Sequence, residues 1–216
     1  MIKAVIFDMD GVILDTEKLY VRFWSEAGRA CGYPMEPRHA LAIRSLARPY
    51  AIEKLRGFFG ENFDYDLVRN KRIELMDAYV REHGVEAKPS AAETLSWLNE
   101  NGYGVALATA TPAARAKEYL GSLGLLEYFD KIVSAREVPR GKPMPDIYLK
   151  ASSELGFSPS ECMAVEDSLN GIRSASSAGC LTVMAVDLDE PSDEAKALVH
   201  SCVRNLRELI PLMKSV

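Results

Sequence analysis

The sequence is poor in cysteine, and its few cysteines are not spaced to bind a metal. The four cysteines form no C-x-x-C pair, and the three histidines lie far from them along the chain. Zinc sites need ligands at short, regular spacings, and disulfide frameworks belong mainly to small secreted domains. We therefore expect buried, reduced thiols, with neither a zinc site nor a disulfide framework.

Long apolar runs are also absent. No segment approaches the length of a membrane-spanning helix, and the apolar run that follows Met1 ends at Asp8, which is too short for the core of a signal peptide. From these absences we expect a cytoplasmic protein that has no membrane partner.

Neither sign of charge is in large excess, and no block of like charge interrupts the chain. The sequence has 26 lysines and arginines against 31 aspartates and glutamates, which gives a formal net charge of −5. Nucleic-acid binding needs a basic surface that displaces counterions from phosphates, so this balance argues against a nucleic-acid partner. A local basic pocket for a small anion is compatible with it.

The chain does contain ample apolar material in short segments. Its 216 residues, 48% of them hydrophobic, can form one domain that carries a smaller insertion, and we expect a monomer. Apolar runs of strand length lie at 4–7, 105–108, 132–133, 162–165 and 181–186. Helical patterns lie between and after them, at 90–102, 111–120, 146–155, 168–178 and 205–213. This alternation predicts an α/β fold, a parallel sheet with helices on both faces.

Two of these helix starts are predicted from their first residues. Ser90 followed by Glu93 is typical of a capping box, and Thr111 before Pro112 is typical of an N-cap before a proline in the first turn. The free backbone N–H groups at the start of the second helix would suit an anion.

The stretch 16–87 interrupts the alternation and contains no convincing strand. Two amphipathic helical patterns dominate it, at about 20–32 and about 67–84. We therefore expect a core made of 1–15 and 88–216, with a helical insertion at 16–87 placed after the first strand.

Polar residues follow the predicted strands at the point where each strand ends. Asp8 and Asp10 follow the first strand, Thr109 the next one, and Glu166 and Asp167 a later one. The carboxyl ends of parallel strands share one edge of the sheet, where ligands bind. Crowded carboxylates need protons or a cation to offset their charge, and an oxygen-only ligand set favours a hard ion such as Mg²⁺, commonly paired with a phosphate. We expect such a site at this edge.

A lysine supplies the positive charge that a phosphate needs. Lys142 lies between Gly141 and Pro143, in a stiff loop that suits a point charge for a phosphate. Each motif alone has an ordinary explanation: turn chemistry for the aspartates, helix capping for the threonine and a solvated loop for the lysine. Their coincidence at one edge of a sheet favours a single site.

Taken in order, these motifs resemble those of the haloacid dehalogenase superfamily. Its four signature motifs are matched, across nearly the whole chain, by Asp8-Met9-Asp10-Gly11-Val12, Thr109, Gly141-Lys142-Pro143 and Glu166-Asp167-Ser168. The segment from Lys142 to Tyr148 and the helical insertion are similar to the β-phosphoglucomutase-like phosphatase branch. The resemblance implies a Rossmann-like core and a helical cap that closes over a small phosphorylated metabolite.

The resemblance also implies a role for each matched residue. Asp8 would attack phosphorus and form an aspartyl phosphate, and Asp10 would protonate the leaving oxygen and then activate water or a second hydroxyl. The transferring phosphoryl group would be held by Thr109, the backbone of Ala110, and Lys142. The ligands of Mg²⁺ would be Asp8, Asp167 and the backbone carbonyl of Asp10, with Glu166 in support.

Asp10 and two positions in the cap limit which reactions of the superfamily we expect of this chain. Dehalogenases and phosphonate-cleaving relatives lack a carboxylate at the position of Asp10, which argues against both. Tyr20 stands where the sugar mutases usually have a histidine, and Ser45 replaces a glycine that is usual in this cap segment. We therefore favour a Mg²⁺-dependent phosphatase, with a hexose phosphate mutase as the alternative.

The cap also offers candidate substrate contacts. Arg44 and Arg48 lie where mutase-like caps carry basic residues for a second anionic group, although two solvated arginines would look the same in sequence. Together with Tyr20 and Trp24 they are our candidates for the substrate-facing surface. A phosphoacceptor signalling domain is a further alternative, but its motifs would come in a different order and it would carry no cap.

Overall fold

The core is a sheet of six parallel strands in the order β3-β2-β1-β4-β5-β6, in a computed structural model that describes residues 1–216. The strands are β1 (Ala4–Phe7), β2 (Gly104–Thr109), β3 (Lys131–Ser134), β4 (Cys162–Glu166), β5 (Leu181–Ala185) and β6 (Ser201–Val203). The predicted α/β fold is confirmed. The short edge strand β6 was not predicted, because its three residues contain no apolar run.

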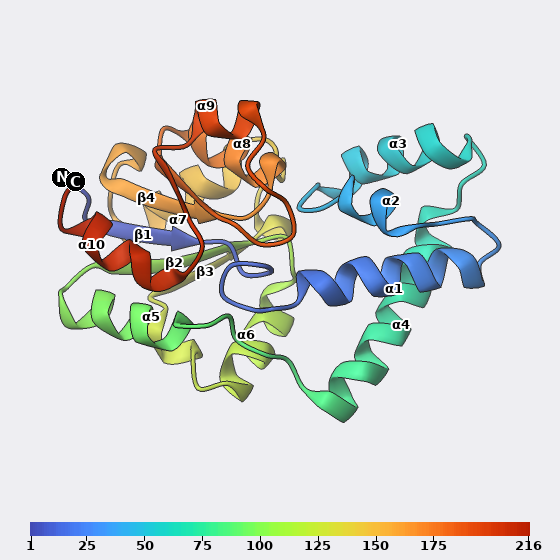
Figure 1. Cartoon of the computed structure of the whole chain (residues 1–216), viewed down its shortest axis with the longest axis horizontal. Coiled ribbons are helices and arrows are strands. Elements are labelled where there is room, and N and C mark those ends of the chain that lie inside the picture. Colours follow the sequence, from blue (N-terminus) through green and yellow to red (C-terminus); the bar gives the residue numbers. More distant parts are fainter.

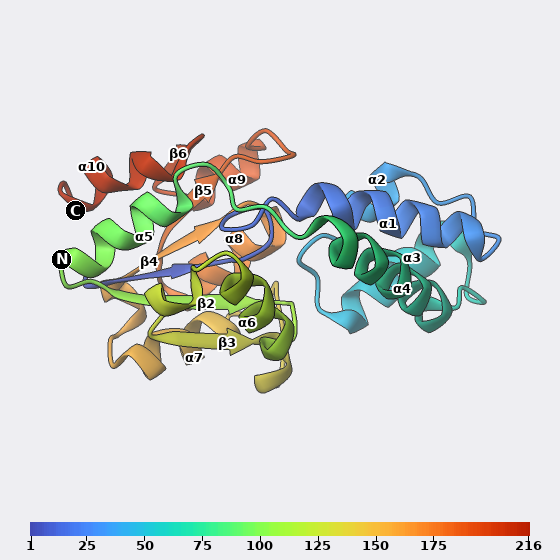
Figure 2. The ribbon, with the colours of Figure 1, turned by 90° about the horizontal axis from the view of Figure 1, so that it is seen from below.

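Helices cover both faces of the sheet (Figure 1). They are α5 (Ala91–Glu100), α6 (Ala113–Ser122), α7 (Asp146–Leu155), α8 (Leu169–Ala178), α9 (Asp193–Leu198) and α10 (Leu209–Met213). Seen from below, α5, α6 and α10 lie on the near side of the sheet, with α7 and α8 behind it (Figure 2). The predicted helix at 205–213 is split into a 3₁₀ turn (Leu206–Glu208) and α10. No helix is both long enough and apolar enough to cross a membrane.

The alternation of side chains along β1 explains why the strand has no polar face. Val5 and Phe7 belong to the larger hydrophobic cluster with α5 and α10, whereas Ala4 and Ile6 belong to a second cluster with α7. Successive residues of a strand point to opposite faces, so a strand covered on both sides must be apolar throughout. The first residue free of this constraint is Asp8, which follows the strand.

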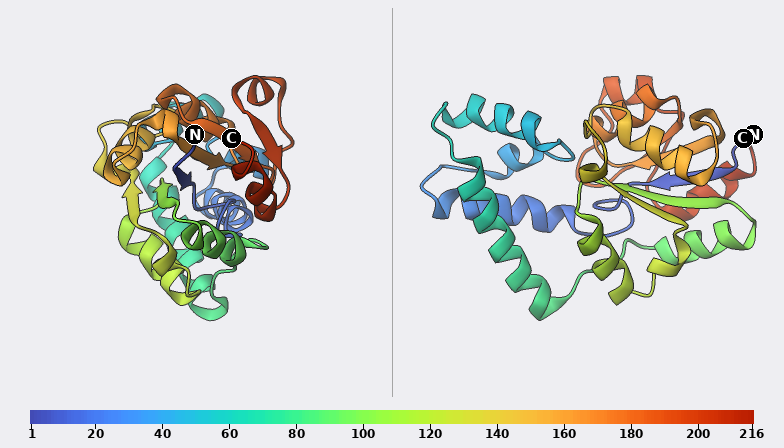
Figure 3. Two further views of the ribbon diagram at one scale, coloured as in Figure 1. Left: turned by 90° about the vertical axis from the view of Figure 1, so that its left-hand side faces the viewer. Right: turned by 180° about the vertical axis from the view of Figure 1, so that it is seen from behind.

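The insertion forms a helical cap beyond the carboxyl ends of the strands, opposite the two chain termini (Figures 1 and 3). Its helices are α1 (Glu17–Ala30), α2 (Pro37–Leu41), α3 (Arg48–Phe59) and α4 (Tyr65–His83). The cap has its own hydrophobic cluster, which includes Trp24, Met35, Leu55 and Val68. The long helices α1 and α4 were predicted, but α2 and α3 were not.

The two chain segments that join cap and core run side by side. The N–H of Asp15 donates to the carbonyl of Glu86, and the N–H of Lys88 donates to that of Ile13, both at 2.8 Å. These bonds lie at the predicted boundaries between 15 and 16 and between 87 and 88, which remain a prediction.

Both predictions of helix starts were wrong in detail. Ser90 has a φ of 64° and makes no capping hydrogen bond, so the capping box with Glu93 does not form. The helix predicted at Thr111 begins at Ala113, with Pro112 in the N-cap position. The Thr111 hydroxyl donates to Asp10 instead of capping the helix.

Candidate active site

The loop after β1 carries the first carboxylates of the site. Asp8 continues the strand, and its N–H donates to the carbonyl of Val165 at 2.9 Å. Gly11 then turns the chain with a φ of +85°, which glycine adopts without steric cost. A Cβ at Gly11 would collide with the carboxyl group of Asp167. The glycine therefore lets the loop come close to the carboxylates that follow β4.

A buried lysine joins Asp8 to the end of β4. Lys142, with 1% of its side chain exposed, contacts Asp8 Oδ1, Glu166 Oε1 at 2.6 Å and the carbonyl of Ala108 at 3.0 Å. These three acceptors match the three N–H groups of the ammonium. Tyr148 donates to the same Glu166 oxygen at 2.6 Å, and its ring centroid lies 5.4 Å from the ammonium. The lysine is therefore held in one place by carboxylates.

Burial and charge act in opposite directions on this pair. Burial acts to lower the pKa of Lys142, but Asp8 and Glu166 outweigh it and raise that pKa, so the lysine stays charged. Burial raises the pKa of Asp8 well above its usual value; Lys142 opposes this shift, and Glu166 and Asp167 add to it. A further cation beside Asp8 would favour its ionised form, which is the form that can act as a nucleophile.

Asp167 is the carboxylate without a hydrogen-bond partner. It is fully buried, and neither of its carboxylate oxygens accepts a hydrogen bond. Burial raises the pKa of Asp167 to about 7, against the opposing effect of Arg44. Ligand oxygens of Asp8, Glu166 and Asp167 lie within 4.8 Å of one another. Because buried charge needs a partner, these oxygens fit a hard divalent cation.

Glu166 differs from its neighbour because its oxygens are already engaged. Oε1 accepts from Tyr148 and Lys142, and Ser168 donates to Oε2 at 3.4 Å. A Cβ at Gly171 would overlap the Glu166 carboxyl group, so a glycine is needed where α8 passes it. Glu166 therefore fixes Lys142 more than it offers a vacant oxygen to a cation.

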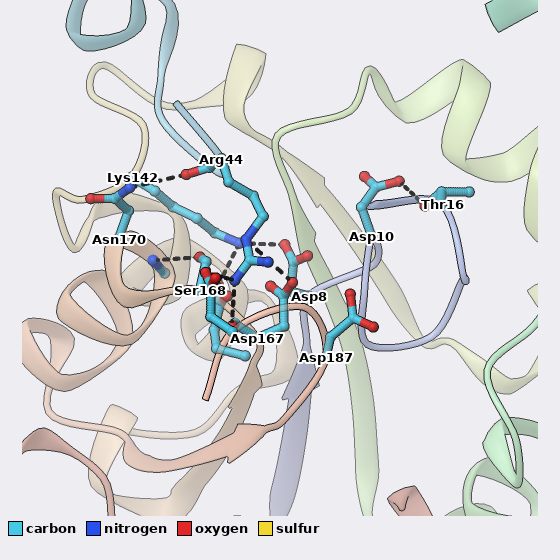
Figure 4. A network of polar contacts seen from close by, with 12 residues as sticks. Asp8, Asp10, Thr16, Arg44, Lys142, Asp167, Ser168, Asn170 and Asp187 are labelled. Carbon is cyan, nitrogen blue, oxygen red and sulfur yellow. Dashed lines mark hydrogen bonds and ion pairs between the residues drawn. The ribbon is translucent and has the colours of Figure 1, made fainter. Parts of the chain in front are cut away.

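Asp10 points away from this carboxylate cluster (Figure 4). Its two oxygens accept from Thr16 Oγ1 at 2.5 Å and Thr111 Oγ1 at 2.9 Å, and the hydroxyl of Tyr20 lies 3.2 Å from that of Thr111. Burial raises the pKa of Asp10, and the two threonine hydroxyls oppose the shift. A buried carboxyl group with a raised pKa can hold a proton for a leaving group.

Arg44 reaches from the cap into the core. Its Nη2 donates to the backbone carbonyl of Asp167 at 2.8 Å (Figure 4). The same atom contacts Asp189 Oδ2 at 3.0 Å, and the Nε lies 3.7 Å from Asp167 Oδ2. Asn170 donates to the carbonyl of Arg44 at 3.0 Å. With only 3% of its side chain exposed, Arg44 ties the cap to the carboxylate edge of the sheet.

A cavity of about 1040 Å³ lies between the core and the cap. The candidate residues that line it are Asp8, Asp10, Ala110, Tyr20, Trp24, Arg44 and Arg48. Lys142, Glu166 and Asp167 lie behind this wall, next to Asp8. Thr109 is also buried behind it, and its hydroxyl accepts from the N–H of Thr111 at 3.0 Å. The structure thus gathers the candidate residues of the core around one end of the cavity.

Several polar residues of the site were missed in the sequence. Thr16 and Thr111 hold Asp10, and Tyr148 holds Glu166. Asp187 and Asp189 follow β5, so the rule that polar residues at strand ends form the site would have found them. The hydroxyl residues carry no such signal, because threonine is common in turns and helix caps.

A comparison with protein families bears on this site. The model of the family described as "haloacid dehalogenase-like hydrolase" matches residues 2–179. The chain belongs to the haloacid dehalogenase-like hydrolases. The predicted superfamily is therefore confirmed by the match.

Similar proteins of known name include phosphatases. The chain is 36% identical over 205 residues to hexitol phosphatase A of Escherichia coli (strain K12), covering 92% of this chain and 91% of that one. It is 34% identical over 222 residues to the phosphorylated carbohydrates phosphatase of Thermotoga maritima, covering 99% of both. The fold is similar to that of β-phosphoglucomutase from Clostridium difficile, with a TM-score of 0.81 over 100% of this chain and 96% of that one at 23% identity. The predictions of a phosphatase and of a core with a helical cap are confirmed.

Proposed function

We propose that this protein hydrolyses phosphate monoesters of small sugars or sugar alcohols, with Mg²⁺ as cofactor and Asp8 as nucleophile. The observation that carries the proposal is the position of Asp8, which faces the cavity beside the buried ammonium of Lys142 and the Asp167 carboxylate, whose oxygens accept no hydrogen bond. The names of the two similar phosphatases, one for hexitols and one for phosphorylated carbohydrates, support the substrate class.

In the first step the Asp8 carboxylate attacks phosphorus, and the bond from phosphorus to the sugar oxygen breaks. An anionic carboxylate approaches an anionic phosphate only if the charge of both is offset. Lys142 supplies one positive charge directly beside the attacking Asp8 carboxylate. The hydroxyl of Thr109 and the backbone of Ala110 complete the phosphoryl site in this proposal.

Asp10 transfers the protons. It gives a proton to the departing sugar oxygen, and as a carboxylate it then takes one from the water that attacks the aspartyl phosphate. Thr16 and Thr111 hold both of its oxygens, which fixes the carboxyl group for the two steps.

Mg²⁺ would be held by Asp8, Asp167 and the backbone carbonyl of Asp10, with Glu166 beside them. When bound it would supply the remaining positive charge that the approach of two anions requires. The feature of this chain that supports such an ion is the pair of Asp167 oxygens, neither of which accepts a hydrogen bond.

The test is the release of inorganic phosphate from sorbitol 6-phosphate and β-glucose 1-phosphate in the presence of Mg²⁺. We expect free phosphate from both esters over many turnovers. Glucose 6-phosphate should be followed in parallel, with a trace of the bisphosphate present. If it forms from β-glucose 1-phosphate much faster than phosphate is released, the enzyme is a mutase and the hydrolase proposal is wrong.

A further inference from the structure

Two arginines are buried in this protein, and only one of them has acidic partners. Arg44 contacts Asp167 and Asp189, as described above. Arg72, on α4 of the cap, is 7% exposed and contacts no carboxylate, and its Nε has no hydrogen-bond partner. Its one hydrogen bond runs from Nη1 to the sulfur of Met76 at 3.8 Å, which is a weak acceptor.

The surroundings of Arg72 do not replace a counter-ion. Its guanidinium carbon lies 5.1 Å from the ring centroid of Tyr20 and 5.4 Å from that of Trp24. Aromatic faces attract a cation but leave the in-plane N–H groups without acceptors. Burial lowers the pKa of Arg72, yet a guanidinium remains protonated in proteins. The cap therefore holds a buried positive charge with free donors.

Arg69 adds a second free charge on the same helix face. It precedes Arg72 by three residues, a spacing that places both side chains on one side of α4, and both line the cavity. Arg69 is half-buried and has no carboxylate within ion-pair distance.

The other arginines of the cavity wall are paired with a carboxylate, as Arg140 is with Asp146, or are exposed. Arg48 pairs with Asp66 at 2.5 Å, and Arg115 pairs with Asp77 at 2.9 Å. Arg136 has no acidic partner, but it is exposed and belongs to the core. The cap wall thus presents one pair of unpaired arginines to the cavity.

We propose that Arg72, assisted by Arg69, binds a second oxyanion of the substrate, away from the ester phosphate, so that the enzyme favours phosphoesters that carry a second anionic group. This inference rests on the proposed function, because it presumes a phosphoester whose first phosphate lies at Asp8 on the core wall. The oxyanion is a carboxylate or a second phosphate, both of which accept two parallel N–H groups from a guanidinium. The charges of Arg44 and Arg48 are already paired within the protein.

Two matched pairs of esters test the proposal and separate the two oxyanions. 6-Phosphogluconate differs from sorbitol 6-phosphate by a carboxylate in place of a hydroxymethyl group, and fructose 1,6-bisphosphate differs from fructose 6-phosphate by a second phosphate. The kcat/KM for phosphate release is measured for wild type, Arg72→Gln, Arg72→Lys, Arg69→Gln and the control Arg81→Gln. Arg81 is exposed on α4 and does not line the cavity.

In at least one pair, we expect wild type to prefer the ester that carries the second anionic group. Arg72→Gln should lower kcat/KM on that ester by roughly 10- to 100-fold, the range of a lost charge-assisted hydrogen bond, and change that on its partner by less than about threefold. Arg72→Lys should restore part of the loss, Arg69→Gln should cause a smaller one, and Arg81→Gln none.

The proposal is wrong if wild type prefers the ester with the second anionic group in neither pair, or if folded Arg72→Gln loses activity equally on all four. If Arg72→Gln does not fold, the wild-type preference and the loss in Arg69→Gln decide the question instead.

A binding measurement separates this proposal from the proposed function. In a Trp97→Phe background Trp24 is the only tryptophan, and it lies beside Arg72. Its fluorescence is titrated with 6-phosphogluconate, sorbitol 6-phosphate, fructose 1,6-bisphosphate and fructose 6-phosphate. Tighter binding of an ester with a second anionic group, without turnover of any ester, would support the role of Arg72 and contradict the proposed hydrolase activity. Turnover of the esters with equal binding within both pairs would support the proposed hydrolase activity and contradict the role of Arg72.

Discussion

The cavity has a core wall, which includes Asp8 and Asp10, and a cap wall, which includes Arg69 and Arg72. The charged groups of the two walls differ in whether they have partners within the protein. On the core wall, Asp10 has a hydroxyl on each oxygen, and directly behind this wall Lys142 has carboxylate partners on two sides. On the cap wall, Arg72 lies against two aromatic rings and forms no ion pair with a carboxylate. The charged groups of the core wall thus have partners within the protein, whereas the unpaired arginines of the cap wall would find theirs in a bound ligand.

This difference indicates how the work is divided. Charges that are fixed by protein partners can stabilise a transition state without rearrangement, which suits the phosphoryl transfer common to all substrates of the enzyme. Charges without partners have free donors to give to a ligand, which suits recognition of the variable part of a substrate. We therefore expect core substitutions to affect every substrate, and cap substitutions to affect some.

The largest expected effect is that of Asp8→Asn on the core wall. An amide cannot form the acyl phosphate, so turnover should fall by roughly 10⁴-fold or more on every ester. Phosphate release and a thermal melt of the same preparation measure this. If a folded Asp8→Asn protein keeps substantial activity on any ester, the core wall does not hold the nucleophile assigned to it.

Removal of divalent cations should also abolish turnover of all substrates. Mg²⁺ should restore it and Ca²⁺ should not, because Ca²⁺ prefers a looser coordination geometry. Full activity in excess chelator would contradict the proposal that a divalent cation beside Asp167 is required.

The same ion should change the pH dependence of stability. The pKa of Asp167 is raised by burial to about 7 from an unfolded value of 3.8. The folded state therefore binds more protons between these values, so without a divalent cation the contribution of Asp167 to stability is lost as the pH rises through this window. Thermal midpoints should show that Mg²⁺ stabilises the protein more at about pH 8 than at about pH 5. Asp167→Asn should remove most of this difference, and an unchanged difference would contradict the assignment.

Asp10→Asn should give the next largest effect. Loss of proton transfer typically costs ~10²–10⁴-fold, and we expect that loss on sugar phosphates, whose alkoxide is a poor leaving group. In a single-turnover measurement, formation of the phosphoenzyme from an aryl phosphate should suffer less, because a phenolate departs without a proton. Equal losses on both esters would argue against Asp10 as the acid.

The smallest expected effect is that of Arg48→Ala on the cap wall. Arg48 is 58% exposed and pairs with Asp66, and exposed ion pairs contribute little to stability. We expect kcat/KM to change by less than about threefold on every ester, in contrast to Arg72→Gln. A large loss confined to esters with a second anionic group would show that Arg48, and not Arg72, binds that group.

The sequence predicts the core wall far better than the cap wall. Strand ends put Asp8, Thr109 and Asp167 at one edge because a parallel sheet leaves no other arrangement, and the fold confirms that placement. No comparable rule connects Arg72 with the cavity. On α4 it is one of several arginines, and only the packing of α1 against α4 shows that its side chain is buried beside Tyr20.

Helix boundaries fail for a related reason. Thr111 has the chemistry of an N-cap, but a buried carboxylate 2.9 Å away competes for its hydroxyl. The carboxylate belongs to a residue about one hundred positions earlier, so local sequence contains no sign of it. The helices α2 and α3 escaped prediction because the cap folds around its own hydrophobic cluster, in which packing outweighs local propensity.

The measurement that tests the central claim most directly is the detection of phosphate on Asp8. The Asp10→Asn variant should form the aspartyl phosphate from an aryl phosphate and lose it slowly, since no base activates the water. After an acid quench, mass spectrometry of the peptides should find one added phosphoryl group on the peptide that contains Asp8, and none in the Asp8→Asn/Asp10→Asn double variant. A burst of released phenol with no phosphoryl group on that peptide, or with the group on another peptide, would contradict the account.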